Sequence, residues 1–548
     1  MSKVDRDLAN TNGSVAGQLI DYGAKAKKEN ILKDILPPRL AQYHIDRRYW
    51  IHDLEFFDST YNCIGIDVAS LIGHKKMSLS KAMRKLYREI IRLTNEQSGG
   101  IGFIDFDKDM AVYITDESDE EIAEQIDELF SDLNVYVRKG CEKAYITFNF
   151  GLDTSENGRR FSRIMLEQYE SGDSEGKPYV FPNLVFKLKD GVNSKEDDRN
   201  YDIFTKACEV TSKCMIPTYF NCDCSINKAA NPHSIGIMGC RTRVIDNIFG
   251  EKTSLHRGNI ACVTINLVQI ALESGNNIDK FKEELDKVME EARKLLIYRF
   301  NVLCQNNEFS YLREKNLYLD SEQTNRNMLK NGTLSIGFIG LWDAMEILTN
   351  KKMSKEYILK DFSSSAYEII SFMKNKIDKY TEEEKMNFSL LASAAEGVSG
   401  NFPKYDKEKY KENEWIADKE YYTNSFHVPV NMDISCVEKI IAEGKYHKLC
   451  TGGAITYVEL KEVPVGNIEG IRDIILFAKE QDCSYFGINF PLDVCEECGF
   501  KGMIGKTCPK CGGNKILKLR RVSGYLSDSC KFTHGKYAEL MERKANKI

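Results

Sequence analysis

Four cysteines near the C-terminus limit what this chain can fold into more than any other feature. They follow the spacing C-x2-C-x9-C-x2-C. The four residues are Cys495, Cys498, Cys508 and Cys511. Two residues between a pair of thiolates let one tight turn present both sulfurs to a single ion. Gly499 and Gly512 follow the two pairs, where the backbone needs angles that favour glycine. The spacing predicts a structural four-thiolate zinc ribbon, with an iron–sulfur cluster as the alternative.

The overall composition is typical of a globular protein of the reducing cytoplasm. The chain has 548 residues, of which 42% are hydrophobic and 29% charged, so it can bury a large core without disulfides. Its 17 cysteines come without a secretory signal, which favours a reducing cytosol, where thiols bind metal or do chemistry rather than form disulfides, and most of those outside the motifs are expected to be buried and unreactive. The sequence has no apolar run of about 18 residues that would predict a membrane span. The formal charge of -6 indicates no general attraction to nucleic acid.

Strand and helix patterns alternate along most of the chain. Residues 276–303 carry apolar side chains at steps of three and four, which predicts a long helix. Ser118 followed by Glu121 predicts a capping box at the start of an acidic helix. Residues 144–150 are strong strand formers. This alternation indicates an α/β architecture, and the Cys-, Gly- and Lys-rich composition from Pro491 onward indicates a separate module.

A glycine follows the predicted ribbon in the segment RVSGYL at residues 521–526. Taken alone, Gly524 is no more than a turn glycine. Its place behind four paired cysteines resembles the glycyl-radical loop of class III (anaerobic) ribonucleotide reductases. Further segments are similar to that family and occur in its order. They are IHDL at 51–54, NC at 62–63, QSGG at 97–100, DFD at 105–107, MGCR at 238–241, RGN at 257–259, AEG at 395–397 and YTNS at 422–425.

The resemblance implies a fold and a division into domains. The fold would be of the α/β class, a ten-stranded α/β barrel built from two five-stranded halves, with the zinc ribbon at its C-terminal end. Two loops would meet inside the barrel, one with Cys240 and one with Gly524. The implied domains are a catalytic barrel over 1–487, a ribbon over 488–515, and the glycyl-radical loop and tail over 516–548. The N-terminus is shorter than the ATP-cone regulatory domain of many family members requires.

The resemblance also implies an oxidoreductase that converts ribonucleoside triphosphates to deoxyribonucleoside triphosphates by radical chemistry. A radical at the 3' carbon of the ribose weakens the bond to the 2'-OH, and a thiyl radical can abstract the hydrogen that this requires. Gly524 would store the radical, and Cys240 would become the thiyl. Cys63 would donate a hydrogen atom toward the 2' position. Asn259 matches an asparagine of formate-using members, so formate is the expected reductant and a thioredoxin-like protein the alternative.

Substrate binding is expected at two further places. The resemblance implies that Thr423, Asn424 and Ser425 hold the phosphates with hydroxyls and backbone N–H groups, whereas the residues alone would indicate only the cap of a loop. His52 is predicted to lie near the substrate, although a buried histidine that only forms hydrogen bonds is the competing interpretation. The family implies a radical-SAM activating enzyme, which uses S-adenosylmethionine and a 4Fe–4S cluster to form the radical on Gly524. It also implies dNTP or ATP specificity effectors and a homodimer.

Two other functions are compatible with parts of the sequence. Formate-lyases and dehydratases of the glycyl-radical class share a radical glycine and a loop cysteine, but the ribbon argues against them. A nucleic-acid-binding ribbon would use the basic residues of the tail. These are Lys501, Lys506, Lys510, Lys515, Lys518, Arg520 and Arg521. That interpretation leaves the MGCR, NC and RGN segments unexplained, so we expect neither nucleic acid nor a membrane as a partner.

Overall fold

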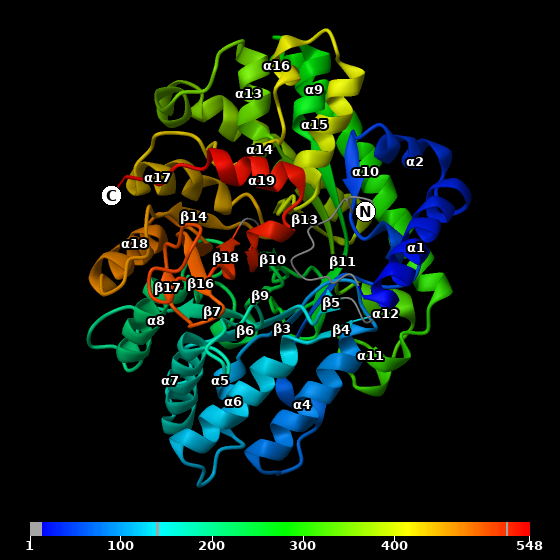
Figure 1. The fold of residues 1–548 in the computed structure, drawn as a ribbon. Coiled ribbons are helices and arrows are strands. Elements are labelled where there is room, and N and C mark those ends of the chain that lie inside the picture. The colour runs from blue at the N-terminus through cyan, green and yellow to red at the C-terminus, as the bar shows by residue number, and fades with distance from the viewer. Residues whose placement is uncertain (1–13, 139–141, 522–523, 548) are drawn as a thin grey trace.

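A mixed sheet forms the centre of the molecule (Figure 1). The computed structural model describes residues 14–138, 142–521 and 524–547. Residues 1–13, on which the expected absence of a secretory signal depends, lie outside this description, as do Val522 and Ser523 of the glycine segment. Ten strands follow one another in the order β13-β12-β11-β2-β3-β6-β7-β8-β15-β14, and β1 (Tyr49–Ile51) pairs with β11 as an addition to this path.

The ten strands fall into two halves of five. The first half is entirely parallel. It contains β2 (Cys63–Ile66), β3 (Ile101–Phe103), β6 (Ile146–Phe150), β7 (Asn183–Leu188) and β8 (Thr218–Asn221). The second half contains β11 (Arg257–Asn266), β12 (Thr333–Ile339), β13 (Asn387–Ala392), β14 (Thr456–Glu459) and β15 (Tyr485–Asn489). Antiparallel pairs β2–β11 and β8–β15 join the halves, and a parallel bridge from Leu391 to Gly453 closes the ring. The predicted ten-stranded α/β barrel is therefore confirmed.

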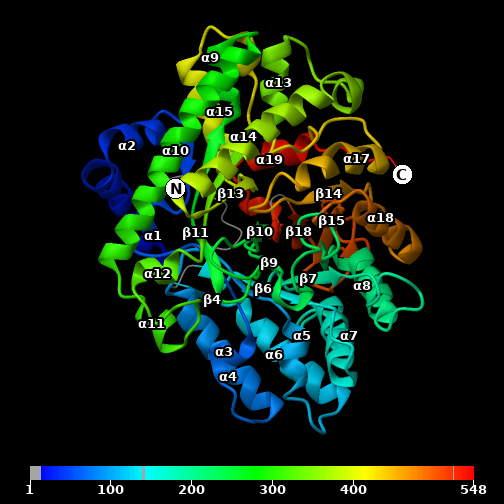
Figure 2. The same ribbon diagram turned by 180° about the vertical axis from the view of Figure 1, so that it is seen from behind.

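Helices cover the outside of this barrel (Figures 1 and 2), because parallel strands need long crossover connections. Those of the first half are α3 (Val68–Ile72), α4 (Leu79–Thr94), α5 (Phe106–Ala111), α6 (Asp119–Leu133), α7 (Glu156–Ser171) and α8 (Tyr201–Cys214). Those of the second half are α9 (Leu267–Ser274), α10 (Ile278–Asn306), α11 (Ser310–Glu314), α12 (Asn325–Leu329), α13 (Leu341–Thr349), α14 (Ser363–Glu384), α15 (Val398–Lys409), α16 (Glu414–Ala417), α17 (Cys436–His447) and α18 (Ile468–Glu480). The chain starts with α1 (Val15–Asn30) and α2 (Pro38–Ile45) and ends with α19 (His534–Glu542). Among the described helices, none has the length and apolar character that a membrane crossing requires.

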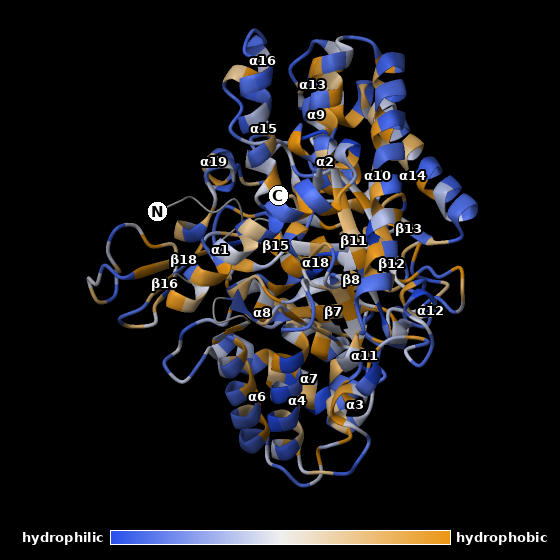
Figure 3. Ribbon diagram, turned by 90° about the vertical axis from the view of Figure 1, so that its right-hand side faces the viewer, coloured by the Kyte–Doolittle hydropathy of each residue, from blue (hydrophilic) through white to orange (hydrophobic). Residues whose placement is uncertain are grey.

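Local sequence signals account for the two helices predicted from the sequence. The side chain of Ser118 accepts a hydrogen bond from the N–H of Glu121, whose carboxylate in turn accepts from the N–H of Ser118, so the capping box at the start of α6 is confirmed. α10 covers nearly all of the predicted stretch and buries Phe281 and Leu285 among its apolar positions. Figure 3 shows the barrel strands as largely hydrophobic ribbons at the centre, with more polar helices around them.

The side chains of β6 point alternately to the two sides of the barrel wall. Ile146, Phe148 and Phe150 belong to the main hydrophobic core. Thr147 and Asn149 alternate with them and form hydrogen bonds to Gly239 and Ile237 of a loop inside the barrel. Because side chains of a strand point alternately to its two faces, the apolar residues pack toward the helices and the polar ones face the interior. The inside of this barrel is therefore built to hold polar chain segments.

The cysteine-rich module forms a small sheet of its own that follows the barrel directly. Its strands pair in the order β17-β16-β18-β19. They are β16 (Leu492–Cys495), β17 (Lys501–Gly502), β18 (Ile516–Arg521) and β19 (Leu526–Asp528). In Figure 3 the strands β16 and β18 lie at one side of the molecule. The predicted boundaries at 488 and 516 stay a prediction, since β18 pairs with β16 and carries the ribbon sheet directly into the glycine segment.

Candidate active site

A loop between β8 and β11 enters the barrel and carries Cys240. It contains the short strands β9 (Ile237–Met238) and β10 (Thr242–Arg243), which pair antiparallel around the turn with Cys240. Side chains of β6 hold this finger loop. Asn149 both donates to and accepts from the backbone of Ile237 (2.9 and 2.8 Å), and the Thr147 hydroxyl donates to the carbonyl oxygen of Gly239 (3.2 Å). The position of Cys240 is thus set by polar residues of the barrel wall.

The glycine segment enters the barrel from the ribbon and meets the finger loop. β18 and β19 pair with Arg521 opposite Leu526, and Gly524 lies between these two residues in the sequence. Its φ is +143°, a region that other residues rarely adopt. A Cβ on Gly524 would lie 2.8 Å from the Cα of Cys240 and 2.9 Å from its carbonyl oxygen, closer than real Cβ atoms approach. Only glycine fits here, and its α-carbon lies against Cys240.

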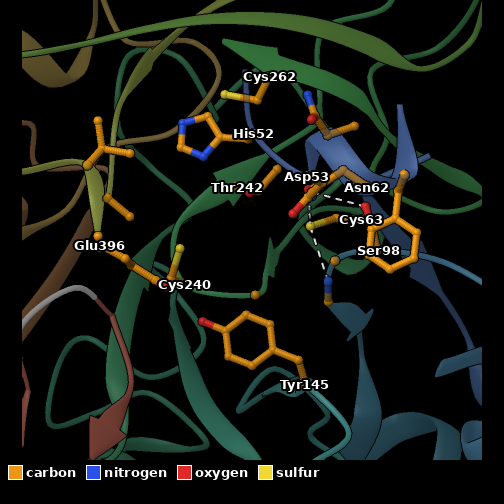
Figure 4. Close-up of a pocket in the computed structure, with 18 of the residues that line it drawn as sticks. His52, Asp53, Asn62, Cys63, Ser98, Tyr145, Cys240, Thr242, Cys262 and Glu396 are labelled. Carbon is orange, nitrogen blue, oxygen red and sulfur yellow. Dashed lines mark hydrogen bonds between the residues drawn. The ribbon is translucent and has the colours of Figure 1, made fainter. Parts of the chain in front are cut away.

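A cavity of about 420 Å³ opens beside these two loops. Cys240, Cys63, Asn259 and His52 all line it, as does Tyr525, the neighbour of Gly524. Figure 4 shows the sulfurs of Cys240 and Cys63 facing the same space from different elements of the barrel. The structure therefore brings together every residue for which the sequence predicted a role in the radical chemistry.

Strand register explains why Cys63 and Asn259 are neighbours. β2 and β11 are antiparallel, and Cys63 is the direct partner of Asn259. The thiol of Cys63 donates to Oδ1 of Asn62 (2.7 Å), and its sulfur accepts from the N–H of Gly100 (3.3 Å). A Cβ on Gly99 would lie 2.7 Å from this sulfur. Gly99 of the QSGG segment thus makes room for Cys63, whereas a Cβ on Gly100 would meet Gly239 of the finger loop (2.9 Å).

Asn259 and His52 are both tied to the barrel wall. The side-chain amide of Asn259 donates to the hydroxyls of Thr333 (3.0 Å) and Ser335 (2.7 Å), which leaves its carbonyl oxygen as the group available to a ligand. Nε2 of His52 shares a hydrogen bond with the hydroxyl of Thr264 (2.7 Å). Burial lowers the pKa of His52, so the ring is neutral near pH 7 and can take part only through hydrogen bonds.

Burial keeps the cavity thiols protonated. It raises the pKa of Cys63 to about 12. It also raises the pKa of Cys240, and the nearby carboxylate of Glu396 acts in the same direction, while the Arg241 guanidinium opposes them. A neutral S–H group is a donor of hydrogen atoms, whereas a thiolate is a nucleophile and metal ligand. The environment therefore suits hydrogen-atom transfer rather than nucleophilic attack.

Three lining residues were not predicted as site residues from the sequence. Tyr145 packs edge-on against the ring of Tyr525 (centroids 5.3 Å apart), and Figure 4 shows it beside Cys240. Cys262 lies on β11 and lines the same cavity as Cys63 and Cys240. Glu396 also lines it, and its AEG segment was the sequence signal that could have marked it. A cysteine and a tyrosine in strand patterns give no such signal.

The predicted phosphate-binding residues are not among the lining residues of this cavity. Thr423 lines a second cavity of about 480 Å³, and its N–H donates to Asp343 (2.7 Å). Within the described part of the chain, Oδ1 of Asn424 and the hydroxyl of Ser425 are buried without a hydrogen-bond partner. Ser425 also has a φ of +43°, which is unusual for a residue other than glycine. Their role in binding phosphate stays a prediction.

The four ribbon cysteines come together as a cluster. Their sulfurs lie within 4.8 Å of one another, and the pairs Cys495–Cys511 and Cys498–Cys508 are each 3.6 Å apart. Four sulfurs bound to one zinc ion at about 2.3 Å would be about 3.8 Å apart in a tetrahedron. The cluster therefore fits a tetrahedral metal ion such as zinc.

The backbone around the cysteines has the form predicted for metal-binding turns. Gly499 and Gly512 have φ values of +69° and +75°, which confirms why glycine follows each pair. The N–H of Lys510 donates to the sulfur of Cys508 (3.4 Å), and the N–H of Gly513 donates to that of Cys511 (3.4 Å). Such N–H groups stabilise thiolates, so the donor set suits a cation.

Comparison with known proteins identifies the family. The sequence pattern of the family described as anaerobic ribonucleoside-triphosphate reductase matches residues 7–545. The chain belongs to this family. It is therefore an oxidoreductase that reduces ribonucleoside triphosphates under anaerobic conditions, with a radical cofactor. The family also decides against the other glycyl-radical enzymes and the nucleic-acid-binding ribbon that the sequence had left open.

Relatives of known function match nearly the whole chain. The anaerobic ribonucleoside-triphosphate reductase of Escherichia coli K12 is 28% identical over 564 residues, which cover 93% of this chain and 78% of that one. The same enzyme of phage T4 is 28% identical over 612 residues, covering 99% and 97%. A structure of the Thermotoga maritima anaerobic ribonucleotide reductase in complex with dATP and CTP superposes with a TM-score of 0.76 at 18% identity, covering 96% and 92%.

The barrel itself is shared more widely. A B12-independent glycerol dehydratase of Clostridium butyricum superposes with a TM-score of 0.58 at 13% identity and covers 97% of this chain and 73% of its own. At such identities the likeness concerns the fold alone. The function of the enzyme follows from its family and from the site, since one fold can serve different reactions.

Proposed function

We propose that Gly524 holds the radical of this reductase and that Cys240 carries it to the nucleotide. The contact between the α-carbon of Gly524 and Cys240 supports this assignment most directly, because hydrogen-atom transfer needs near contact. Cys240 gives its thiol hydrogen to the Gly524 α-carbon: the S–H bond breaks, a C–H bond forms, and the unpaired electron moves to the sulfur. The sulfur then abstracts the 3' hydrogen of the ribose.

Loss of the 2'-OH follows from this radical at the 3' carbon. The 2' hydroxyl leaves as water when it takes up the proton that the 3' hydroxyl loses, and Cys63 donates a hydrogen atom to the 2' carbon, which leaves a 3' ketone and a thiyl radical on Cys63. The reductant then gives one hydrogen atom to the Cys63 sulfur and one electron to the ketone, which takes up a proton and becomes a radical at the 3' carbon. Cys240 later returns a hydrogen atom to the 3' carbon, and the radical goes back to Gly524. The carbonyl oxygen of Asn259 is placed to accept a hydrogen bond from a ribose hydroxyl, since its amide group donates to Thr333 and Ser335.

We propose formate as the reductant. One formate and one proton convert the ribonucleotide to the deoxyribonucleotide, carbon dioxide and water, which balances the two electrons required. Asn259 beside Cys63 supports this choice. The presence of Cys262 in the same cavity favours a second candidate, in which Cys63 and Cys262 form a disulfide that a thioredoxin-like protein reduces.

Thr423, Asn424 and Ser425 are proposed to bind the substrate phosphates. The unpartnered oxygen atoms of Asn424 and Ser425 and the unusual φ of Ser425 support a binding segment, because buried polar groups normally have partners. The N–H of Tyr422 donates to the carbonyl oxygen of Ser399 (2.9 Å) in α15, the helix whose first residue, Val398, lines the active-site cavity. His52 is proposed to bind the substrate as a neutral hydrogen-bonding group.

The ribbon is proposed to hold zinc through Cys495, Cys498, Cys508 and Cys511, where the ion would fix the turns that precede the glycine segment. A radical-SAM activating enzyme is proposed to form the radical on Gly524. Ribonucleoside triphosphates are the proposed substrates and dNTP or ATP the proposed effectors, in line with the dATP and CTP in the Thermotoga maritima complex. A homodimer in the cytoplasm is proposed as well.

Two measurements test the proposed chemistry. After anaerobic activation, electron paramagnetic resonance should show a doublet caused by the one α-hydrogen that remains on Gly524. Formate labelled on carbon should then give labelled carbon dioxide in step with deoxynucleotide. Absence of the doublet in a protein that still reduces nucleotides would contradict the role of Gly524. Turnover with a dithiol and without labelled carbon dioxide would contradict formate and support the pair of Cys63 and Cys262.

A further inference from the structure

The two loops that exchange the hydrogen atom share one side chain of the barrel wall. Asn183 is the first residue of β7 and is buried, with an exposed fraction of 2%. Its amide nitrogen lies 3.3 Å from the carbonyl oxygen of Gly239 and 3.5 Å from that of Gly524, and it donates to both. Gly239 precedes Cys240 in the finger loop. The amide therefore connects the finger loop to the glycine loop, which is the part of the chain that carries Gly524.

Sheet register places Asn183 at this point. β6 and β7 are parallel, and Thr147 is the direct partner of Asn183. Neighbours in register point to the same face of a sheet, so both side chains face the barrel interior at one level. Both also donate to the same acceptor, the carbonyl oxygen of Gly239. Thr147 reaches only the finger loop, whereas Asn183 also reaches Gly524.

We infer that Asn183 is a positioning residue that sets the separation of the Gly524 α-carbon from the Cys240 sulfur. An amide nitrogen carries two hydrogens, so it can hold two carbonyl oxygens at once, each next to a reacting residue. A buried amide needs partners, and here both partners belong to the reacting loops. Because a shift of about 1 Å can lower a rate by ~100-fold, loss of this link slows the hydrogen-atom transfer.

The inference rests on the proposed roles of Gly524 and Cys240, and it has a direct readout. The thiol hydrogen exchanges with solvent, so in D2O the Gly524 radical takes up deuterium from Cys240. The thiyl then removes hydrogen from the same carbon, and the doublet collapses as the α-hydrogen is replaced. The rate of collapse reports the transfer between the two residues without any nucleotide, reductant or turnover.

The test compares Asn183→Leu with the wild type and with Asn193→Leu. Asn193 is a matched control, since it is fully buried and its amide also donates to two backbone carbonyls, those of Gly151 (3.0 Å) and Lys187 (2.8 Å), away from both loops. We expect Asn183→Leu to form the radical but to slow the collapse by roughly tenfold or more. Asn193→Leu should collapse at the wild-type rate.

Two further variants keep the test decisive if Asn183→Leu does not fold. Asn183→Asp retains the shape but loses at least one donor, and we expect an intermediate slowing. Thr147→Val frees only one bond to the finger loop, and its slowing should be smaller than that of either Asn183 variant. If the doublet of folded Asn183 variants collapses at the wild-type rate, the inferred role of Asn183 is overturned, but the roles of Gly524 and Cys240 are not. A wild-type doublet that does not collapse overturns the proposed roles of Gly524 and Cys240 as well.

Discussion

The finger loop and the glycine loop end at the same point but are held in different ways. The finger loop is part of the barrel, and Thr147 and Asn149 of β6 fix its backbone from inside. The glycine loop comes from the ribbon, where it connects β18 and β19 of a separate small sheet. Its contacts with the wall include the bond from Asn183 and the packing of Tyr525 against Tyr145.

This difference has a physical reason. The proposed role of Cys240 requires a permanent place beside the substrate, and a closed sheet with a buried core provides it. The proposed role of Gly524 requires that an activating enzyme reach it, and a loop carried by a separate module can be reached without disruption of the barrel. The difference predicts that damage to the ribbon affects the glycine loop and leaves the finger loop in place.

The largest effect is expected from Gly524→Ala. The added methyl group would overlap Cys240 and would force a residue with a side chain into a φ of +143°. We expect complete loss of the radical doublet and of nucleotide reduction, measured by electron paramagnetic resonance and product assay. Gly505→Ala is the matched control, because a Cβ there meets nothing within 4 Å. A doublet of normal intensity in Gly524→Ala would contradict the assignment.

Cys240→Ser should leave radical formation on the glycine loop intact and abolish the reaction that depends on the finger loop. Serine keeps the shape of the finger loop, but its O–H bond is too strong to give a hydrogen atom to a glycyl radical. We expect a normal doublet after activation, no collapse of it in D2O, and no deoxynucleotide. Cys304→Ser, at a partly buried thiol of α10, should behave as the wild type. Any nucleotide reduction by Cys240→Ser well above background would show that another thiol starts the reaction.

Removal of one of the four ribbon cysteines tests whether a bound metal ion helps to position the glycine loop. In Cys508→Ser or after chelation of the metal, we expect the radical content to fall several-fold, because the ribbon no longer holds the start of the glycine loop in place. The thermal unfolding of the barrel should change little. Cys530→Ser, at an exposed thiol of the tail outside the cluster, is the control. Full radical content in Cys508→Ser would mean that the ribbon does not position Gly524.

The smallest effect is expected from pH. Hydrogen-atom transfer needs the neutral thiol of Cys240, which is present below its pKa and lost above it. Because burial raises this pKa above the ordinary value of 9.0, the rate of doublet collapse should fall to half only at a pH above 9.0. A thiol with the ordinary pKa would be half ionised at pH 9.0. A collapse rate that has already halved at or below pH 9.0 would show that Cys240 is more open to water than the structure indicates.

Local patterns predicted several parts of the molecule correctly. The capping box of Ser118 and Glu121, the long helix α10 and the two glycines of the metal-binding turns depend on residues close in sequence. The four-cysteine cluster could be predicted for the same reason, since each pair of ligands lies within one turn. The barrel and the roles of Cys240 and Cys63 came from the resemblance to a family rather than from periodicity.

The sequence by itself determined the order of the segments and the four-cysteine module, and it placed a glycine a short distance behind that module. Only the tertiary structure decided which atoms meet: Gly524 against Cys240, Asn183 between their loops, and Cys262 in the cavity. The physical reason is that closure of the sheet and its register bring distant segments together. A buried asparagine or cysteine in a strand has no local pattern that reveals which loop it will face.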